Sequence, residues 1–191
     1  MKHFNIVLLI IAITMLSSFI LKDADFKIDA QKSKITWVGK KVTGQHNGTV
    51  NLAEGSFTSI GKNITGGSFT IDMTSIKDAE ASARLEGHLK SDDFFSTEKF
   101  PKSTFVITKI KSKGTDQYAI KGNLTIKGIT NEVEYPATIK ITKNQLTATA
   151  KIIVDRTKFD IKFRSGNFIE NLGDKAIEDN FELNVELVGN K

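Results

Sequence analysis

The sequence predicts a mainly β protein, an eight-stranded antiparallel β-barrel with a short helical cover between two of its strands. Three observations support this prediction. Apolar residues recur at every second position in several stretches, and turn residues separate those stretches. The length of 191 residues, with 39% hydrophobic and 26% charged residues and no evident repeat, suits one domain with one core.

Period-two alternation identifies the strands. In residues 118–126 the apolar side chains of Tyr118, Ile120, Leu124 and Ile126 share one parity, and polar residues dominate the other. Such a stretch forms a strand with one buried face. The stretches expected to form strands are residues 35–42, 49–57, 64–73, 103–110, 118–127, 133–141, 146–154 and 181–187.

Short connections separate these strands and imply antiparallel neighbours. An antiparallel sheet with one apolar face either closes into a barrel or splits into two packed layers. The predicted turns are Gly61 to Asn63, Lys113 to Asp116, Gly128 to Asn131, and Lys143 with Asn144.

Small residues share the inward parity at Gly122, Ala137, Ala148 and Ala150. Two interpretations follow. The small side chains leave an apolar cavity that holds a ligand, or they relieve crowding in a core packed to ordinary density. Periodicity does not measure a cavity, so both stay open at this point.

The segment between the strands at 64–73 and 103–110 predicts a helical cover. Asp78 is placed to cap a helix, and Leu85 and Leu89 lie one helical turn apart. A further turn carries Phe94 and Phe95. Since these four apolar side chains avoid water, we expect them to close the barrel from one end.

His88 lies near Asp92 and Asp93 in this cover, which suggests three roles. Spacing of i, i+4 on a helix suits metal ligands or an acid–base pair, and the same residues also serve as caps and hydrogen-bond partners. With no nucleophile motif and no second suitable histidine nearby, we expect the third role, no metal and no catalytic residue.

The first residues predict export. Met1 and Lys2 precede an apolar run from Phe4 to Leu21, which is typical of a secretory signal peptide over residues 1–21 and also approaches the length of a retained anchor. The remaining residues, 22–191, form the single domain.

The chain has no cysteine, which excludes disulfides and thiolate chemistry. Its basic residues are dispersed, so nucleic-acid binding is not expected, whereas transient contact with a membrane is compatible with them.

Several segments resemble a known family. The segments GHLKSDDFFSTEKFPKSTFVIT, GNLTIKGITNEVEYPATI and VDRTKFDIKF are similar to those of the YceI-like family, and the resemblance spans residues 26–188. Asp160 stands where that family usually has Gly, and Ser96 where it often has Asp. The resemblance implies a lipocalin-like barrel whose elongated apolar pocket holds a polyisoprenoid or an isoprenoid quinone, in the periplasm or secreted. It brings no catalytic residue, and no cofactor other than the bound lipid.

On this basis the protein is expected to bind, store or transport a long apolar lipid. The alternatives are a filled-core envelope stress or interaction protein without cargo, and an enzyme using His88. A barrel mouth or an uncovered sheet edge would favour a homodimer. The candidate ligand-binding residues are Trp37, Phe69, Ile71, Met73, Leu85, Leu89, Phe94, Phe95, Phe105, Ile107, Leu124, Ile126, Tyr135, Ile139, Ile152, Val154 and Phe181.

Two polar residues have open roles. The hydroxyl of Tyr135 either meets a ligand head group or has an internal partner. Arg156 either holds a polar head at the mouth or forms a salt bridge that fixes the loop between Asp155 and Phe181.

Overall fold

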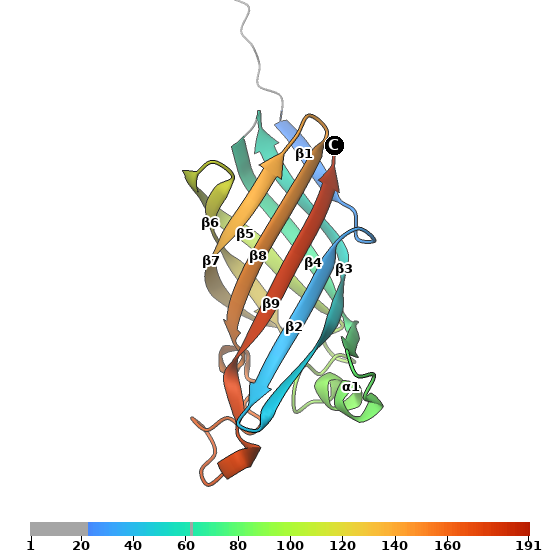
Figure 1. Ribbon diagram of the computed structural model, residues 1–191, viewed down its shortest axis with the longest axis vertical. Coiled ribbons are helices and arrows are strands. Elements are labelled where there is room, and N and C mark those ends of the chain that lie inside the picture. The colour runs from blue at the N-terminus through green and yellow to red at the C-terminus, as the bar shows by residue number, and fades with distance from the viewer. Residues whose placement is uncertain (1–22, 62) are drawn as a thin grey trace, which may run out of the picture.

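Figure 1 shows the computed structural model, which describes residues 23–61 and 63–191; the predicted signal peptide, residues 1–21, lies outside the described residues. None of the helices in these two ranges is long and apolar enough to cross a membrane. The strands are β1 Asp23–Ile28, β2 Lys34–Lys41, β3 Gly44–Ile60, β4 Asn63–Asp78, β5 Lys102–Gly114, β6 Gln117–Ile126, β7 Ile129–Ile141, β8 Gln145–Asp155 and β9 Ile177–Asn190. The helices are α1 Ala83–Lys90 and the short 3-10 helices η1 Arg156–Phe159 and η2 Gly173–Lys175.

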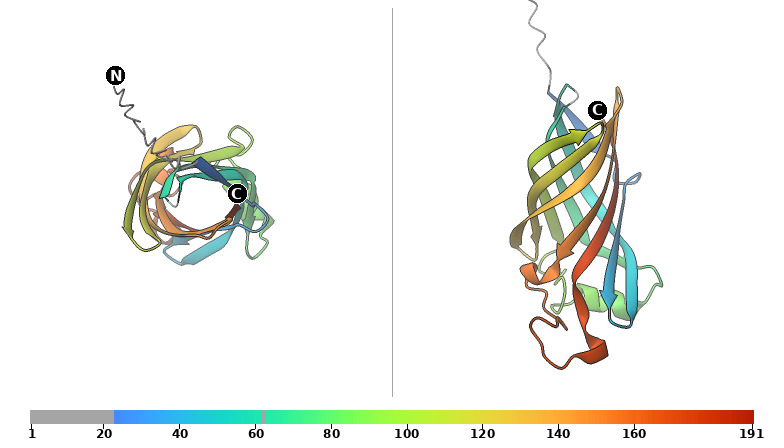
Figure 2. Two further views of the ribbon diagram at one scale, coloured as in Figure 1. Left: turned by 90° about the horizontal axis from the view of Figure 1, so that it is seen from above. Right: turned by 60° about the vertical axis from the view of Figure 1, so that its left-hand side comes forward.

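The sheet closes on itself. Its strands follow the order β1-β3-β2-β9-β8-β7-β6-β5-β4, and β3 pairs with β4 as well, so the described strands form a ring. β1 and β2 occupy one place in that ring, because each pairs with β3 on one side and β9 on the other. The left view of Figure 2 looks along the barrel. The predicted eight-stranded antiparallel barrel is thereby confirmed, with one of its eight places divided between two strands.

A local turn divides that place. The Asp29 carboxylate accepts hydrogen bonds from the main-chain N–H groups of Gln31 (3.0 Å) and Lys32 (3.2 Å), and the Ser33 hydroxyl donates to the Asp29 carbonyl (2.7 Å). Asp readily forms such turns, which compete with the sheet ladder. β1 was not among the predicted strands, because its six residues are too short for alternation to stand out.

Hairpin geometry corrects one predicted turn. Lys127 and Gly128 both have positive φ (51° and 74°), which is the backbone of a two-residue hairpin turn between β6 and β7. The turn predicted at Gly128 to Asn131 therefore starts one residue earlier, and Ile129 already belongs to β7.

One end of the barrel is filled. Phe26, Ile28, Ile64 and Leu146 are buried, with exposed fractions of 0–6%. Phe26 and Ile28 belong to β1, and Ile64 and Leu146 stand near the starts of β4 and β8. β1 and the C-terminus lie at the same end of the barrel in Figure 1. Because large side chains occupy this end, any interior space must open elsewhere.

The helical segment covers the other end (Figure 1). Ser82, not Asp78 as predicted, caps α1: its hydroxyl accepts from the N–H of Leu85 (3.3 Å). Asp78 is the last residue of β4 and accepts from the N–H of Ser82 (3.1 Å), which fixes the chain one turn before the helix. The predicted cover is present, and Leu89 and Phe94 are its buried apolar residues.

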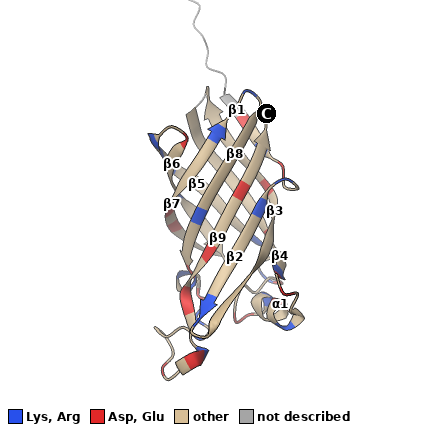
Figure 3. Ribbon diagram, viewed as in Figure 1, with Lys and Arg blue, Asp and Glu red and all other residues tan. Residues whose placement is uncertain are grey.

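Charged residues lie on the outside of the wall. In Figure 3, Lys and Arg are scattered among Asp and Glu over the strands of the visible face. One such pair is Lys151 with Glu182 on β8 and β9 (2.8 Å). This distribution fits the alternation of polar residues outward and apolar residues inward.

Candidate functional site

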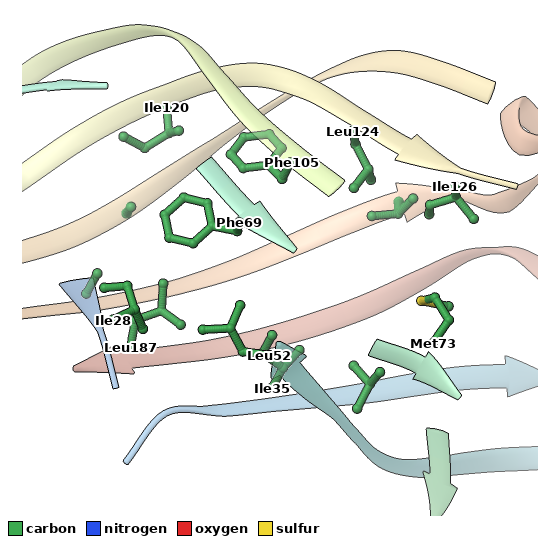
Figure 4. Packing of buried hydrophobic residues seen from close by; sticks show 14 of the residues in the cluster. Ile28, Ile35, Leu52, Phe69, Met73, Phe105, Ile120, Leu124, Ile126 and Leu187 are labelled. Carbon is green, nitrogen blue, oxygen red and sulfur yellow. The ribbon is translucent and has the colours of Figure 1, made fainter. Parts of the chain in front are cut away.

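An apolar cavity of about 200 Å³ lies inside the barrel. Strands β2 to β9 and the helical cover all contribute to its lining. In Figure 4 the side chains of Phe69, Phe105 and Leu124 lie on neighbouring strands and belong to this interior. An apolar cavity of roughly 150 Å³ stays dry and accepts small apolar guests. The interior is therefore not packed to ordinary density.

The cavity is long and narrow. Along β9 its lining runs from Ile177 to Leu187, a stretch of about 33 Å at about 3.3 Å per residue. A volume of about 200 Å³ distributed over that length describes a tunnel and not a round hollow. Its shape suits an extended chain.

Most of the candidate residues predicted from the sequence surround this tunnel. Leu85 and Val154 are the exceptions, because neither of them lines the tunnel. Leu85 packs half-buried against the core, while Leu89, one turn later, is the residue of α1 that reaches the tunnel. Val154 is 1% exposed and enclosed by its neighbours. The candidates that line the tunnel are Trp37, Phe69, Ile71, Met73, Leu89, Phe94, Phe95, Phe105, Ile107, Leu124, Ile126, Tyr135, Ile139, Ile152 and Phe181.

Further lining residues were not among the candidates. Leu183, Val185 and Leu187 share the parity of Phe181 and were recognisable from the same alternation. In contrast, Ile161 lies in a loop, where no period-two pattern marks it. Other lining residues that the candidate set left out are Ile35, Val50, Leu52, Phe57, Ile76, Ile120 and Val133.

Three alanines provide part of the space. Ala137 and Ala150 are paired across β7 and β8, and Ala148 is paired with Ile139. All three alanines line the tunnel. Each has a small side chain and leaves empty the volume that a larger side chain would fill. This agrees with the first interpretation from the sequence, in which small inward residues leave an apolar cavity.

Gly122 does not act in this way. A Cβ atom added there would lie 2.4 Å from Cζ of Phe105 and 2.5 Å from the carbonyl oxygen of Val106. The Phe105 ring therefore occupies the space that the sequence assigned to a guest, and Gly122 is absent from the tunnel lining. Its role is close packing of one ring against the β6 backbone.

This close approach predicts a stability effect. Gly122→Ala should lower the free energy of unfolding by about 1–3 kcal/mol, because the Phe105 ring and the β5 backbone must move. Gly87→Ala is the matched control, since nothing lies within 4 Å of a Cβ atom at Gly87. Chemical denaturation measures both variants. Equal stability of Gly122→Ala and the unmodified protein would contradict the packing described here.

Aromatic rings form a row along one side of the tunnel. Phe57 meets Phe69 edge-on with ring centroids 5.0 Å apart, Phe69 stacks with Phe105 at 6.3 Å, and Phe105 is tilted against Tyr135 at 5.6 Å. These rings come from β3, β4, β5 and β7. They offer an aromatic surface of differently inclined rings to a guest.

Arg156 lies at the covered end and uses all of its donors within the protein. Its guanidinium donates to the main-chain carbonyls of Ile161 (2.7 Å), Phe163 (3.0 Å), Glu178 (3.0 Å) and Ile177 (3.0 Å). Its fifth N–H meets the carboxylate of Asp179 at 3.5 Å. Burial lowers the pKa of this guanidinium, and the Asp179 carboxylate partly offsets that effect. Arg156 thus fixes the loop, the second of the two roles considered, and has no free donor for a ligand.

The wall is irregular near this end. Gly39 pairs with Phe181 and Lys41 with Ile177, so three residues of β9 stand opposite one residue of β2. Such a bulge interrupts the hydrogen-bond ladder. Glu178 and Asn180 within the bulge are exposed and also line the tunnel, which places the mouth here. The rings of Phe95 and Phe181 meet edge-on across it, with centroids 6.3 Å apart.

His88 connects the cover to the following loop. Its ring nitrogen lies 3.2 Å from the Asp93 carboxylate, and its ring meets those of Phe94 (4.9 Å) and Phe163 (4.7 Å) edge-on. Among residues 23–61 and 63–191 no group of three or more His, Cys, Asp or Glu side chains is arranged to hold a metal ion. These contacts give His88 a structural position between two elements.

A closed antiparallel barrel around an apolar tunnel, with a helical cover at one end, defines a lipocalin-like fold. Residues 26–189 match the YceI-like domain family, so the chain belongs to that family. Protein YceI of Escherichia coli O157:H7 is 29% identical over 174 residues, which cover 88% of each chain.

Two solved structures share the fold. BcnA of Burkholderia cenocepacia has a TM-score of 0.67 at 23% identity, covering 84% of this chain and 98% of its own. A polyisoprenoid binding domain from Saccharophagus degradans, implicated in plant cell wall breakdown, also has a TM-score of 0.67, at 12% identity, covering 86% of this chain and 97% of its own. At these identities the comparison establishes a common fold.

Proposed function

We propose that this protein binds a long apolar lipid of the isoprenoid class, a polyisoprenoid or an isoprenoid quinone, and stores or transports it. The observation that carries the proposal is the continuous apolar tunnel. Family membership and the polyisoprenoid binding domain with the same fold support it. An isoprenoid tail has no polar groups to match along its length, so apolar walls are sufficient, and each Å² of apolar contact contributes about 25 cal/mol before association costs.

The two other functions considered have less support. A filled-core interaction protein would need no tunnel, and His88 lies in aromatic and carboxylate contacts that give it a packing role. We therefore propose a binding protein without enzymatic activity, and without a cofactor other than its lipid. The predicted secretory signal leads us to propose a periplasmic or secreted location. A homodimer stays a prediction. The described strands close into a ring, so no end strand of the sheet is left for a second copy to pair with, and the prediction now depends on the tunnel mouth alone.

Lipid extraction tests the proposal. Protein purified from its native envelope is extracted with organic solvent, and the extract is analysed by mass spectrometry. We expect an isoprenoid in near-stoichiometric amount. Repeated preparations without lipid, together with no thermal stabilisation on adding a polyisoprenoid or an isoprenoid quinone, would refute the proposal.

We further propose transient membrane contact during cargo exchange. Two segments near the mouth expose apolar side chains: Val42 (65%) in the β2–β3 turn, and Phe168 (53%) and Ile169 (43%) in the loop of residues 160–176. The two segments are adjacent, because the Val42 N–H donates to the Ala176 carbonyl (3.3 Å). This end of the molecule projects beyond the barrel in Figure 1. Apolar side chains near the mouth would enter the bilayer interface and bring the mouth to the lipid.

Removing two of these side chains tests the contact. The double variant Phe168→Ser, Ile169→Ser should take up lipid from vesicles about tenfold more slowly, because less apolar surface enters the interface. Binding of detergent-solubilised lipid should not change. Ile153→Ser, on the outer wall at 53% exposure, is the control. Equal transfer rates for the double variant and the control would contradict membrane contact through this end.

A further inference from the structure

Two neighbouring strands of the barrel are joined along only part of their length. The β7–β8 ladder has five pairs, which end at Ala137 with Ala150, whereas β8 and β9 are paired at eleven positions and β6 and β7 at ten. Residues 129–136 of β7 and 151–155 of β8 form no pair and no main-chain hydrogen bond with each other. In Figure 1 the two ribbons lie close together near the turn that joins them and separate toward the covered end. We call this unpaired stretch the seam.

Pro136 explains why the ladder stops. The N–H of Ile139 donates to the Asp116 carbonyl, which lies on the β6 side of β7 (2.8 Å). Successive residues of a strand direct their N–H groups to opposite neighbours, so Thr138 and Pro136 face β8. Proline has no N–H to donate. The next position that should bond to β8 after the last pair therefore lacks its donor.

The seam borders the tunnel. Val133 and Tyr135 on β7 and Ile152 on β8 line the tunnel on the two sides of the seam. The Tyr135 hydroxyl forms no hydrogen bond within residues 23–61 and 63–191, so it has neither the internal partner considered from the sequence nor a bond across the seam.

Charged side chains beside the seam are paired away from it. Glu132 on β7 binds Lys121 on β6 (2.7 Å), and Lys151 on β8 binds Glu182 on β9 (2.8 Å). No ion pair joins the two unpaired stretches of the seam.

Side-chain bonds tie the seam at the covered end. Asn131 Nδ2 donates to the carbonyl of Lys158 in η1, directly after β8 (2.8 Å), and Lys127 Nζ lies 3.4 Å from the carbonyl of Asp160. From Ala137 to Asn131 the seam is about 20 Å long at about 3.3 Å per residue. Opening it breaks no ladder pair, which makes it a place of low local stability.

One other ladder is equally short. β4 and β5 also have five pairs, but the gap beside them is filled. A Cβ atom added at Gly67 on β4 would lie 3.2 Å from Cδ1 of Ile107 on β5, so this side chain closes the space where the pairing ends. The seam between β7 and β8 has no such plug among its tunnel-lining residues.

Passage of a guest requires a part that moves. Large side chains fill one end of the barrel, and at the other end Leu89 and Phe94 are buried in the cover while Arg156 fixes the loop. We propose that the seam is a side portal of the tunnel: β7 and β8 part below Ala137 and Ala150, and the cargo enters and leaves between them. This inference rests on the proposed lipid-binding function and concerns its route of exchange.

A removable bridge across the seam tests the portal. The chain has no cysteine, so Asn131→Cys with Lys158→Cys provides two unique thiols. With free thiols, this variant lacks the Asn131 bond and its seam is untied; a short bis-maleimide ties it again. The matched control is Thr125→Cys with Thr130→Cys, treated in the same way. These two hydroxyls lie 2.8 Å apart on β6 and β7, at the same end of the barrel but not across the seam.

Trp37 provides the readout. It is the only tryptophan of the chain and lines the tunnel, so quenching of its fluorescence by an isoprenoid quinone, delivered from detergent, follows entry. Recovery on dilution into empty micelles follows release.

A portal changes both rates together. With free thiols the seam variant should take up and release quinone about fivefold faster than the unmodified protein, since one hydrogen bond no longer opposes opening. The bridged form should be at least tenfold slower than the form with free thiols in both directions, with the Kd within about twofold. The control pair should show no change on bridging.

Equal rates for the bridged and free-thiol seam variant would overturn the portal, as would a changed Kd with an unchanged rate of entry. If quinone causes no saturable quenching in the unmodified protein, the proposed function itself fails.

Discussion

Replacing Arg156 with Met is expected to lower the free energy of unfolding by about 3–5 kcal/mol. The guanidinium is 4% exposed and donates to four main-chain carbonyls and one carboxylate. Met has a similar length but no donor, so these acceptors lose their partners inside the protein. The loop that carries Ile161 and Phe163 loses its attachment to the start of β9.

Thermal unfolding measures this effect. At about 2–4 °C per kcal/mol for a chain of this size, the midpoint should fall by about 6–20 °C. Lys158→Met is the matched control, because Lys158 lies exposed in the same 3-10 helix and its side chain forms no ion pair within the described residues. A midpoint for Arg156→Met within 2 °C of that of the control would show that Arg156 does not fix the loop.

Filling the tunnel should abolish cargo binding without unfolding the barrel. Ala150 lies opposite Ala137 and Val185, and all three line the tunnel. A ring at position 150 would block an extended chain, so we expect Ala150→Phe to raise the Kd for an isoprenoid about 100-fold, or about 2.7 kcal/mol. At about 25 cal/mol per Å², this corresponds to the loss of roughly 110 Å² of apolar contact.

Stability distinguishes a filled tunnel from a damaged fold. Because the ring of Ala150→Phe enters existing space, the free energy of unfolding should be unchanged or higher by up to about 2 kcal/mol. Ala119→Phe provides the control, since Ala119 on β6 has the opposite parity and lies outside the tunnel lining. Normal lipid affinity in a stable Ala150→Phe variant would mean that the cargo binds elsewhere.

The sequence predicted the barrel well because one face of each strand is buried. Period-two alternation specifies which side chains point inward, and this was sufficient to place Phe69, Leu124 and Ile139 around the interior. It also predicted the helical cover from apolar residues at helical spacing. β1 was missed because a strand of six residues carries too little alternation, and its role depends on partners distant in the chain.

The sequence alone could not predict whether the barrel interior contains a tunnel. Inward parity is the same whether a residue borders a void or another side chain, as Ala150 and Gly122 illustrate. Only the position of the Phe105 ring distinguishes them. Residues outside strands were equally hidden: Ile161 lines the tunnel from a loop, and the choice between two roles for Arg156 depends on carbonyls that the fold brings together.

The central claim is that an apolar guest is enclosed inside the barrel, and isothermal titration calorimetry at several temperatures tests it most directly. Titration of an isoprenoid quinone from detergent into the lipid-free protein should give one ligand per chain, with a clearly negative heat-capacity change from burial of apolar surface. Absence of saturable binding, or saturable binding with a heat-capacity change near zero, would contradict enclosure in the tunnel.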